Sequence, residues 1–293
     1  MTNKKSGNKN NVRFVFLGTS HIAVYVLDAL KAAGFLPALV VTPPPAPKGR
    51  GLSSAPTPVA LWARESGISV EHDYKKIESE KWDIGVVVDF GEIIPESILS
   101  VPRRGFLNVH PSLLPRLRGP SPIRSAILND EKTTGVSIIL LDSEMDHGPI
   151  AAQKAVSPRD WPVRASELEE MIMKEGGTLL AQILPLWVAG EIEAREQNHD
   201  IATYTEKIKK EDGLLDLNAD AYQNLLKIRA YEGWPGTYAF FEKNGISANR
   251  RIRVGIIDAH VEDGGLVIDT VKPEGKREMR YEEFLRSGAK STQ

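Results

Sequence analysis

Runs of β-branched and aliphatic residues recur along the first half of this chain and constrain its fold more than any other feature. They lie at residues 12–17, 36–41, 83–88, 106–109 and 135–142. Each run is continuously apolar, which indicates strands buried on both faces and therefore a parallel sheet. Segments with helical periodicity lie between them, at 21–33, 58–66 and 122–129. This alternation predicts a Rossmann-like, doubly wound α/β domain with a mostly parallel sheet.

The sequence changes in character over its last third. Residues 165–190 are expected to form one or two helices, because Gly176-Gly177 and Pro185 interrupt the pattern. A later helix precedes Trp234-Pro235-Gly236, and short strands at turn-rich spacing follow, as in a small barrel or meander. We therefore expect a disordered tail at 1–11, a catalytic domain at 12–205 and a smaller β-barrel domain at 206–293.

Composition excludes several classes of protein. The 293 residues include no cysteine, which rules out disulfides, thiolate metal sites and thiol catalysis and is compatible with a reducing cytoplasm. No window approaches the ~20 apolar residues of a membrane helix, so no membrane association is expected. The net charge of −2 provides no global attraction for nucleic acid, so a polyanionic partner would need a local basic patch.

The segment LNVHPSLLPRLRGPSP, residues 107–122, holds the first candidate chemical groups. Asn108 and His110 alternate at a strand end, so their side chains point to the same face. The prolines at 111, 115, 120 and 122 make the following loop stiff. The pattern indicates an amide and an imidazole held still beside each other.

A second polar segment, DSEMDHGPI, follows the next predicted strand. If the two strands are neighbours, Asp142, Glu144, Asp146 and His147 should reach the same carboxyl-terminal edge of the sheet. An imidazole, a carboxylate and an amide donor suffice for acyl transfer to an amine through a tetrahedral intermediate. Each residue alone fits a structural role better than a catalytic one, and only the combination favours catalysis. A metal site at His110, Asp146 and His147 is disfavoured because adjacent residues seldom face one ion, and we expect no metal.

Other nucleotide-binding and hydrolase motifs are incomplete or missing. Gly18-Thr19-Ser20 follows the first strand but lacks the rest of a G-x-G-x-x-G pattern. Neither G-x-x-x-x-G-K-[ST] nor G-x-S-x-G occurs anywhere in the chain. Dehydrogenase, kinase-like and serine hydrolase chemistry are therefore not expected.

The run N-V-H-P-S-L-L-P-x-x-R-G, with D-x-x-x-D-x-G at 142–148, resembles the formyltransferase family that uses 10-formyltetrahydrofolate. Residues 13–19, 42–59, 88–95 and 203–207 are similar in order and spacing to the methionyl-tRNA formyltransferases. This resemblance covers residues 12–207 and implies that the chain is an enzyme of this kind, a cytoplasmic monomer acting in translation initiation.

The resemblance implies a catalytic trio of Asn108, His110 and Asp146. The acceptor amine would attack the formyl carbon, while Asn108 stabilises the oxyanion and His110 transfers the proton. Asp146 would hold His110 or the proton relay of the folate nitrogen. The folate, as formyl donor, would pack against Ser112, Leu113, Leu114, Pro115, Phe90, Gly91, Ile94 and Asp142. The two leucines could equally be core residues.

The acceptor implied by the resemblance is initiator methionyl-tRNA, contacted by Lys48 and Arg50 of a Gly-Arg-Gly loop. Positions 45, 46, 52 and 53 lack the charged residues that the family often has there. The last domain is similar to the family's tRNA-binding, OB-like barrel but is shortened between Ala259 and Glu262. Candidate phosphate contacts are Lys207, Lys209, Lys210, Arg250, Arg251 and Arg253.

Two other functions remain open from the sequence. A formyltransferase acting on a sugar-nucleotide amine would share the trio but would not need Arg50. A non-catalytic folate- or RNA-binding protein is the third possibility, and the presence of the whole trio argues against it.

Overall fold

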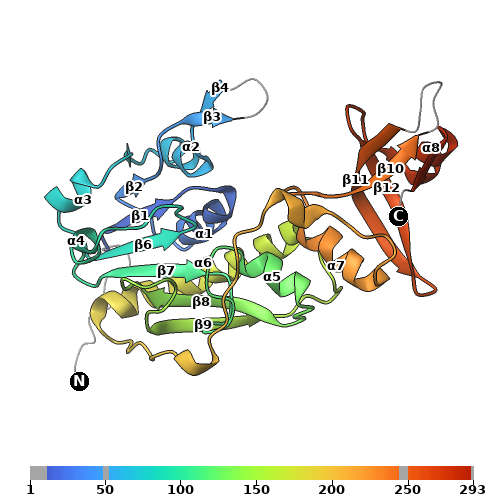
Figure 1. Ribbon diagram of the computed structural model, residues 1–293. Helices are drawn as coiled ribbons and strands as arrows, with labels where there is room; N and C mark the ends of the chain where they lie inside the picture. Colours follow the sequence, from blue (N-terminus) through green and yellow to red (C-terminus); the bar gives the residue numbers. More distant parts are fainter. Residues whose placement is uncertain (1–11, 49–52, 244–249, 292–293) are drawn as a thin grey trace. The chain divides into compact units, whose positions relative to one another are not determined.

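The computed structural model describes residues 12–48, 53–243 and 250–291, so the predicted tail at 1–11 lies outside the described part (Figure 1). The chain forms two compact units. The first comprises Met1–Arg118, Thr134–Val156 and Glu169–Tyr204, and the second comprises Gly119–Thr133, Ser157–Leu168 and Thr205–Gln293. The second unit thus takes two segments from the middle of the chain in addition to its C-terminal part.

The first unit contains the sheet predicted from the apolar runs. Its elements are β1 (Phe14–Gly18), α1 (His21–Ala32), β2 (Leu39–Val41), β3 (Ala46–Lys48), β4 (Ser53–Ala55), α2 (Pro58–Glu65), β5 (Val70–Glu71), α3 (Lys75–Ser79), β6 (Ile84–Val88), α4 (Glu96–Leu99), β7 (Phe106–His110), β8 (Thr134–Leu140), β9 (Ile150–Val156), most of α6 (Ala165–Ala189) and the short 3₁₀ helix η1 (His199–Ile201).

The seven strands of this sheet run in the order β5-β2-β1-β6-β7-β8-β9. The pairs from β5 to β7 are parallel, whereas β8 is antiparallel to both β7 and β9. The prediction of a mostly parallel, doubly wound sheet is confirmed.

Apolar side chains cover both faces of the sheet, as continuously apolar strands require. On one face, Phe106 joins a buried cluster with Val15 and Leu17 that also receives Ile77 of α3 and Ile98 of α4. Helices α1 and α6 cover the opposite face. Ser20 caps α1 by accepting a hydrogen bond from the backbone N–H of Ile22.

Helix α6 is one continuous helix, although both one and two helices were open from the sequence. Its two central glycines allow close packing. A Cβ atom at Gly177 would lie 3.0 Å from Cα of Val26 in α1, and one at Gly176 would lie 2.8 Å from Cγ1 of Val109 in β7. The glycines therefore let the helix approach α1 and the sheet more closely than a side chain would permit.

The second unit has a sheet and core of its own. Its elements are α5 (Pro122–Leu128), the 3₁₀ helix η2 (Lys210–Gly213), α7 (Ala221–Ala230), β10 (Thr237–Lys243), β11 (Arg250–Glu262), β12 (Gly265–Pro273), β13 (Met279–Arg280), α8 (Tyr281–Arg286) and β14 (Ala289–Ser291). The five strands form an antiparallel sheet in the order β13-β12-β11-β10-β14.

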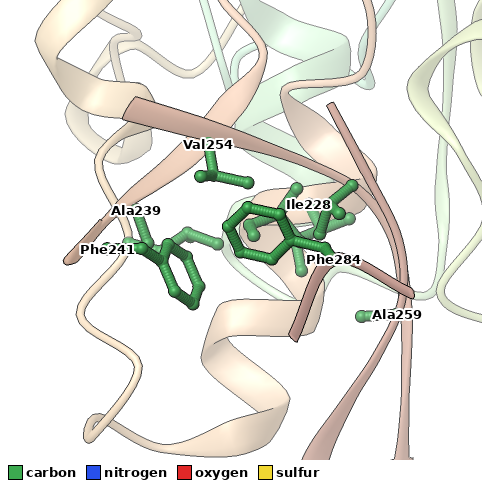
Figure 2. Close-up of a cluster of buried hydrophobic side chains, with 9 residues drawn as sticks. Ile228, Ala239, Phe241, Val254, Ala259 and Phe284 are labelled. Atoms are coloured by element: carbon green, nitrogen blue, oxygen red, sulfur yellow. The ribbon is translucent and has the colours of Figure 1, made fainter. Parts of the chain in front are cut away.

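Figure 2 shows the core of this second unit, where Ile228 of α7 and Phe284 of α8 meet the inner side chains of the sheet. Ala239, Phe241 and Val254 supply that inner face. The rings of Phe241 and Phe284 pack edge to face with centroids 5.3 Å apart. Among the described residues of the whole chain, no helix is both long and apolar enough to cross a membrane.

Candidate active site

Strand β7 presents two polar side chains on one face, as its alternation predicts. Val109 faces α6, so Asn108 and His110 point to the other side of the sheet, the side that also carries Phe106. His110 is only 4% exposed. A buried imidazole needs a hydrogen-bond acceptor for each ring nitrogen that carries a proton, and an oxygen atom lies near both nitrogens.

Asp146 brings a carboxylate to these two residues. Its Oδ1 atom lies 3.5 Å from Nδ2 of Asn108 and 3.4 Å from Nδ1 of His110. Asp146 adopts a left-handed backbone conformation with φ of 51°, which Asp tolerates better than most residues. The structure therefore brings together the three side chains that the sequence singled out.

The route by which Asp146 arrives differs from the predicted one. Strands β7 and β8 are neighbours, but they are antiparallel, with Leu107 opposite Leu140 and His110 opposite Ser137. The end of β8 therefore lies beside the start of β7, and the two carboxyl ends do not share an edge. The loop after β8 turns back instead, so that Asp146 lies over the face of β7 that carries the amide and the imidazole.

The ring of His110 is oriented by a backbone carbonyl. Its Nε2 atom lies 3.0 Å from the carbonyl oxygen of Leu117, which can only accept a hydrogen bond. Nε2 must therefore carry a proton, and in the neutral ring Nδ1 is the basic atom. That basic nitrogen is the one facing Asp146.

The proline-rich loop after β7 is latched to the sheet by polar side chains. Ser137 of β8 accepts a hydrogen bond from the N–H of Leu114 and donates one to the carbonyl of Ser112, at 3.0 and 2.6 Å. Gln153 of β9 donates to both the Leu114 carbonyl and Ser137 Oγ, each at 2.8 Å. The segment 112–114 therefore has little freedom to move relative to the strands.

The predicted folate-binding residues occupy different environments. Ser112 is buried and donates its hydroxyl to the carbonyl of Arg116. Leu114 packs in a buried cluster with Ile139 and Ile150, which is the core interpretation that the sequence left open. Phe90 and Ile94 are partly buried against the cluster around Phe106, and Gly91 is exposed.

The remaining predicted residues of this group lie in the same unit. Leu113 and Pro115 are half-buried in the loop. Asp142 accepts a hydrogen bond from His147 Nδ1 at 2.8 Å, and the His147 ring stacks on that of His199 with centroids 4.0 Å apart. These contacts give the loop after β8 a second point of attachment.

Two buried polar side chains near this loop escaped the sequence analysis as site residues. Arg118 is 1% exposed and Gln197 is 5% exposed, and the two are hydrogen-bonded to each other. Arg118 lies within the Pro-x-x-Arg-Gly motif, so this motif could have marked it as a site residue. Gln197 lies in a stretch without periodicity or motif, and nothing local in the sequence marks it.

The candidate tRNA contacts are only partly described. Lys48 ends β3 of the β3–β4 hairpin, and Arg50 lies outside the described residues. The basic pair Arg103 and Arg104 has a structural use, since both donate to the carbonyl of Val188 near the end of α6.

In the second unit, two exposed arginines stack on aromatic rings. The guanidinium carbon of Arg253 lies 3.7 Å from the ring centroid of Tyr238, and that of Arg251 lies 4.1 Å from the centroid of Phe240. The four residues share the outer face of β10 and β11, opposite the inner face that carries Phe241 and Val254. Stacking holds each guanidinium in place at little cost in hydration.

No group of three or more His, Asp or Glu side chains in the described ranges is placed to hold a metal ion. The polar groups around Asn108, His110 and Asp146 instead provide a hydrogen-bond donor, a base and an anion. That set can stabilise an oxyanion and move a proton without a metal.

Comparison with protein families gives two matches along the chain. Residues 12–184 match the family described as formyl transferase, and residues 207–264 match the formyl transferase C-terminal domain. The first match includes all three residues of the trio.

Comparison with individual proteins agrees with these family matches. The methionyl-tRNA formyltransferase of Chloroflexus aurantiacus is 42% identical over 240 residues, covering 78% of this chain and 76% of that protein. The methionyl-tRNA formyltransferase of Thermotoga maritima is 37% identical over 288 residues, covering 93% and 91%.

Solved structures share the fold at low sequence identity. An N-formyltransferase from Helicobacter canadensis, in complex with folinic acid and dTDP-3-aminofucose, superposes with a TM-score of 0.63 at 19% identity and covers 92% of this chain and all of that one. The methionyl-tRNA formyltransferase from Clostridium thermocellum gives a TM-score of 0.58 at 16% identity and covers 89% and 98%.

Proposed function

This chain belongs to the formyl transferase family, and we propose that it transfers the formyl group of 10-formyltetrahydrofolate to the amino group of methionyl initiator tRNA. The observation that carries the proposed chemistry is the position of Asp146 Oδ1, 3.5 Å from the amide nitrogen of Asn108 and 3.4 Å from the basic nitrogen of His110. The relatives named as methionyl-tRNA formyltransferases support the choice of acceptor.

The reaction needs no covalent intermediate on the protein. The acceptor amine attacks the formyl carbon, a carbon–nitrogen bond forms, and the carbonyl oxygen becomes negatively charged. Asn108 donates a hydrogen bond to that oxyanion through the amide hydrogen that does not face Asp146. Collapse of the intermediate then breaks the bond between the formyl carbon and the folate nitrogen.

His110 carries the proton between the two nitrogens. Its Nδ1 atom is basic because Nε2–H is committed to the Leu117 carbonyl. Nδ1 takes a proton from the attacking amine and returns it to the departing folate nitrogen. The carboxylate of Asp146 stabilises the imidazolium formed between these two steps.

The second unit supports a polyanionic acceptor. Its stacked pairs, Arg253 on Tyr238 and Arg251 on Phe240, present two cations from one face of an antiparallel sheet. Arginine held in this way suits phosphate groups, since the guanidinium edge offers parallel N–H donors. Exposed Lys207, Lys209 and Lys210 add positive charge to the same unit. We further propose that the enzyme works as a cytoplasmic monomer.

An acceptor competition assay tests this function. The purified protein is incubated with 10-formyltetrahydrofolate and a mixture of methionyl initiator tRNA and an amino-sugar nucleotide, and both products are quantified. We expect formylmethionyl-tRNA. Formylation of the sugar alone would replace the proposed acceptor, and transfer to neither would remove the enzymatic function.

A further inference from the structure

Gln197 is hydrogen-bonded to the backbone of the loop that carries Asp146, at this residue and two residues after it. Its Nε2 atom donates to the carbonyl oxygen of Asp146 at 2.8 Å and to that of Gly148 at 2.7 Å. The two hydrogens of one amide group therefore hold two carbonyls of the same loop. Because Gln197 is 5% exposed, water competes little for these bonds.

Arg118 fixes which way the Gln197 amide points. Its Nε and Nη2 atoms donate to Oε1 of Gln197 at 3.2 and 2.6 Å. A guanidinium only donates and a carbonyl only accepts, so the amide can satisfy both sides in one orientation only. Arg118 is itself anchored by a hydrogen bond to Nδ1 of His199 at 2.8 Å.

The same short segment also holds His110. Leu117, directly before Arg118, supplies the carbonyl that orients the imidazole. The N–H groups of Leu117 and Arg118 bind Oγ1 and the carbonyl of Thr203, each at 2.9 Å. One dipeptide therefore fixes the imidazole directly and reaches the backbone of Asp146 through Gln197.

We propose that Gln197 is a positioning residue that sets the distance between Asp146 and His110. Asp146 has a left-handed backbone conformation, and its side-chain direction depends on the peptide that Gln197 holds. Neighbouring Gly148 is packed so tightly that a Cβ atom there would lie 1.9 Å from the Leu140 carbonyl oxygen. A loop packed this closely has one defined position. Loss of the two hydrogen bonds from the Gln197 side chain would displace it. This inference rests on the proposed function.

The change Gln197→Glu isolates the contribution of the two donors. It keeps the shape of the side chain and the acceptor for Arg118 but turns a carboxylate oxygen toward the carbonyls of Asp146 and Gly148. Displacement of a catalytic group by about 1 Å is expected to lower kcat about 10²-fold. KM for both substrates should stay nearly unchanged, because Gln197 contacts neither one.

A double-mutant cycle with Asp146→Ala distinguishes positioning from general stability. If Gln197 acts through Asp146, the double variant should have the kcat of Asp146→Ala alone, within about twofold. Melting temperatures are recorded throughout, and Gln197→Met replaces Gln197→Glu in the cycle if the latter does not fold.

The matched control is Asn224→Asp. Asn224 is an equally buried amide in the second unit that donates to the carbonyl of Asp216 at 2.7 Å. This change should lower the melting temperature and leave kcat unaltered. The inference would be overturned if Asn224→Asp lost as much kcat as Gln197→Glu, or if Gln197→Glu kept the wild-type kcat. It would also be overturned if the effects of the Gln197 and Asp146 changes on kcat were independent in the double-mutant cycle. A wild-type protein that transfers no formyl group would instead overturn the proposed function, and the inference with it.

Discussion

At the scale of single residues, the proposed chemistry depends on which nitrogen of His110 is protonated. The Leu117 carbonyl accepts from Nε2, and this leaves Nδ1 as the base beside Asp146. A different tautomer would place a hydrogen where the amine proton has to go. The tautomer is therefore a property of the folded loop that can be measured without substrate.

Nitrogen-15 NMR of histidine-labelled protein tests this tautomer. At a pH where the imidazoles are neutral, we expect His110 to show a protonated Nε2 and an unprotonated Nδ1. His72 is the internal control, because its Nδ1 lies 2.8 Å from the carbonyl of Thr42 and must carry the proton instead. Observation of the Nδ1–H form at His110 would contradict the proposed proton path.

The sequence predicted part of this site, for identifiable reasons. Asn108 and His110 follow from strand periodicity, which is local. Their proximity to Asp146 depends on a loop that turns back after an antiparallel strand, and the apolar pattern of β8 does not reveal its direction. Gln197 acts through contacts with Arg118 and with Asp146 that are distant in sequence, so no local pattern predicts it.

At the scale of elements, the predicted strands and helices matched because their apolar patterns are long and their ends carry strong signals. Pro58 and Pro122 each open a helix, and Ser20 caps α1. The glycines of α6 left a break in this helix open, whereas in the structure the helix is continuous and the glycines permit close packing. Local propensity cannot report a tertiary contact of this kind.

The latch on the proline-rich loop gives a second prediction. Replacing Ser137 by Ala leaves the buried N–H of Leu114 without its acceptor and frees segment 112–114. We expect KM for the formyl donor to rise about tenfold, equivalent to about 1.4 kcal/mol of binding, with a smaller change in kcat. Steady-state kinetics check this, with Ser100→Ala as an exposed serine control. An unchanged donor KM would argue against a donor-binding role for the loop.

A polar cluster of the second unit should make stability depend on pH. Asp130 Oδ1 accepts from Trp161 Nε1 at 2.6 Å and from the hydroxyl of Tyr222 at 2.8 Å. Partial burial raises the pKa of Asp130, but these hydrogen bonds and nearby Lys132 outweigh it and hold the pKa below its usual value. Burial and the bond to Asp130 raise the pKa of Tyr222 to about 12.

Tyr222→Phe should therefore lower the free energy of unfolding by about 1.5 kcal/mol at pH 7. The lowered pKa of Asp130 contributes stability at pH values above the pKa of an unfolded aspartate, which is about 4. The raised pKa of Tyr222 contributes stability at pH values below the pKa of an unfolded tyrosine, which is about 10. The difference in free energy of unfolding between Tyr222→Phe and wild type should be largest between about pH 4 and about pH 10. It should shrink as pH falls below about 4 or rises above about 10. Urea unfolding across this range measures it, and a pH-independent difference would contradict the assignment.

At the scale of the whole molecule, the chain divides its tasks between two units. The first holds the trio and its supporting loop, and the second presents stacked arginines on an antiparallel sheet. The second unit includes residues 119–133 and 157–168, which interrupt the first along the sequence. A boundary placed along the chain cannot represent such an arrangement, because changes in composition mark only contiguous domains.

Binding of the acceptor should depend on salt through the second unit. The double change Arg251→Gln and Arg253→Gln should weaken binding of methionyl-tRNA and reduce its salt dependence by ~1.4–1.8 log units per log unit of salt. Fluorescence anisotropy over a salt series measures the slope. Arg286→Gln, on α8 beside Glu282, is the control and should leave it unchanged. An unaltered slope in the double variant would place the phosphate contacts elsewhere.

The single-turnover rate of formyl transfer from 10-formyltetrahydrofolate to methionyl initiator tRNA, compared between wild type and His110→Ala, tests the account most directly. We expect the wild type to form formylmethionyl-tRNA and the variant, compared at a temperature where it is folded, to be slower by ~10²–10⁴-fold. A variant that formylates at the wild-type rate would show that the imidazole beside Asp146 does not move the proton.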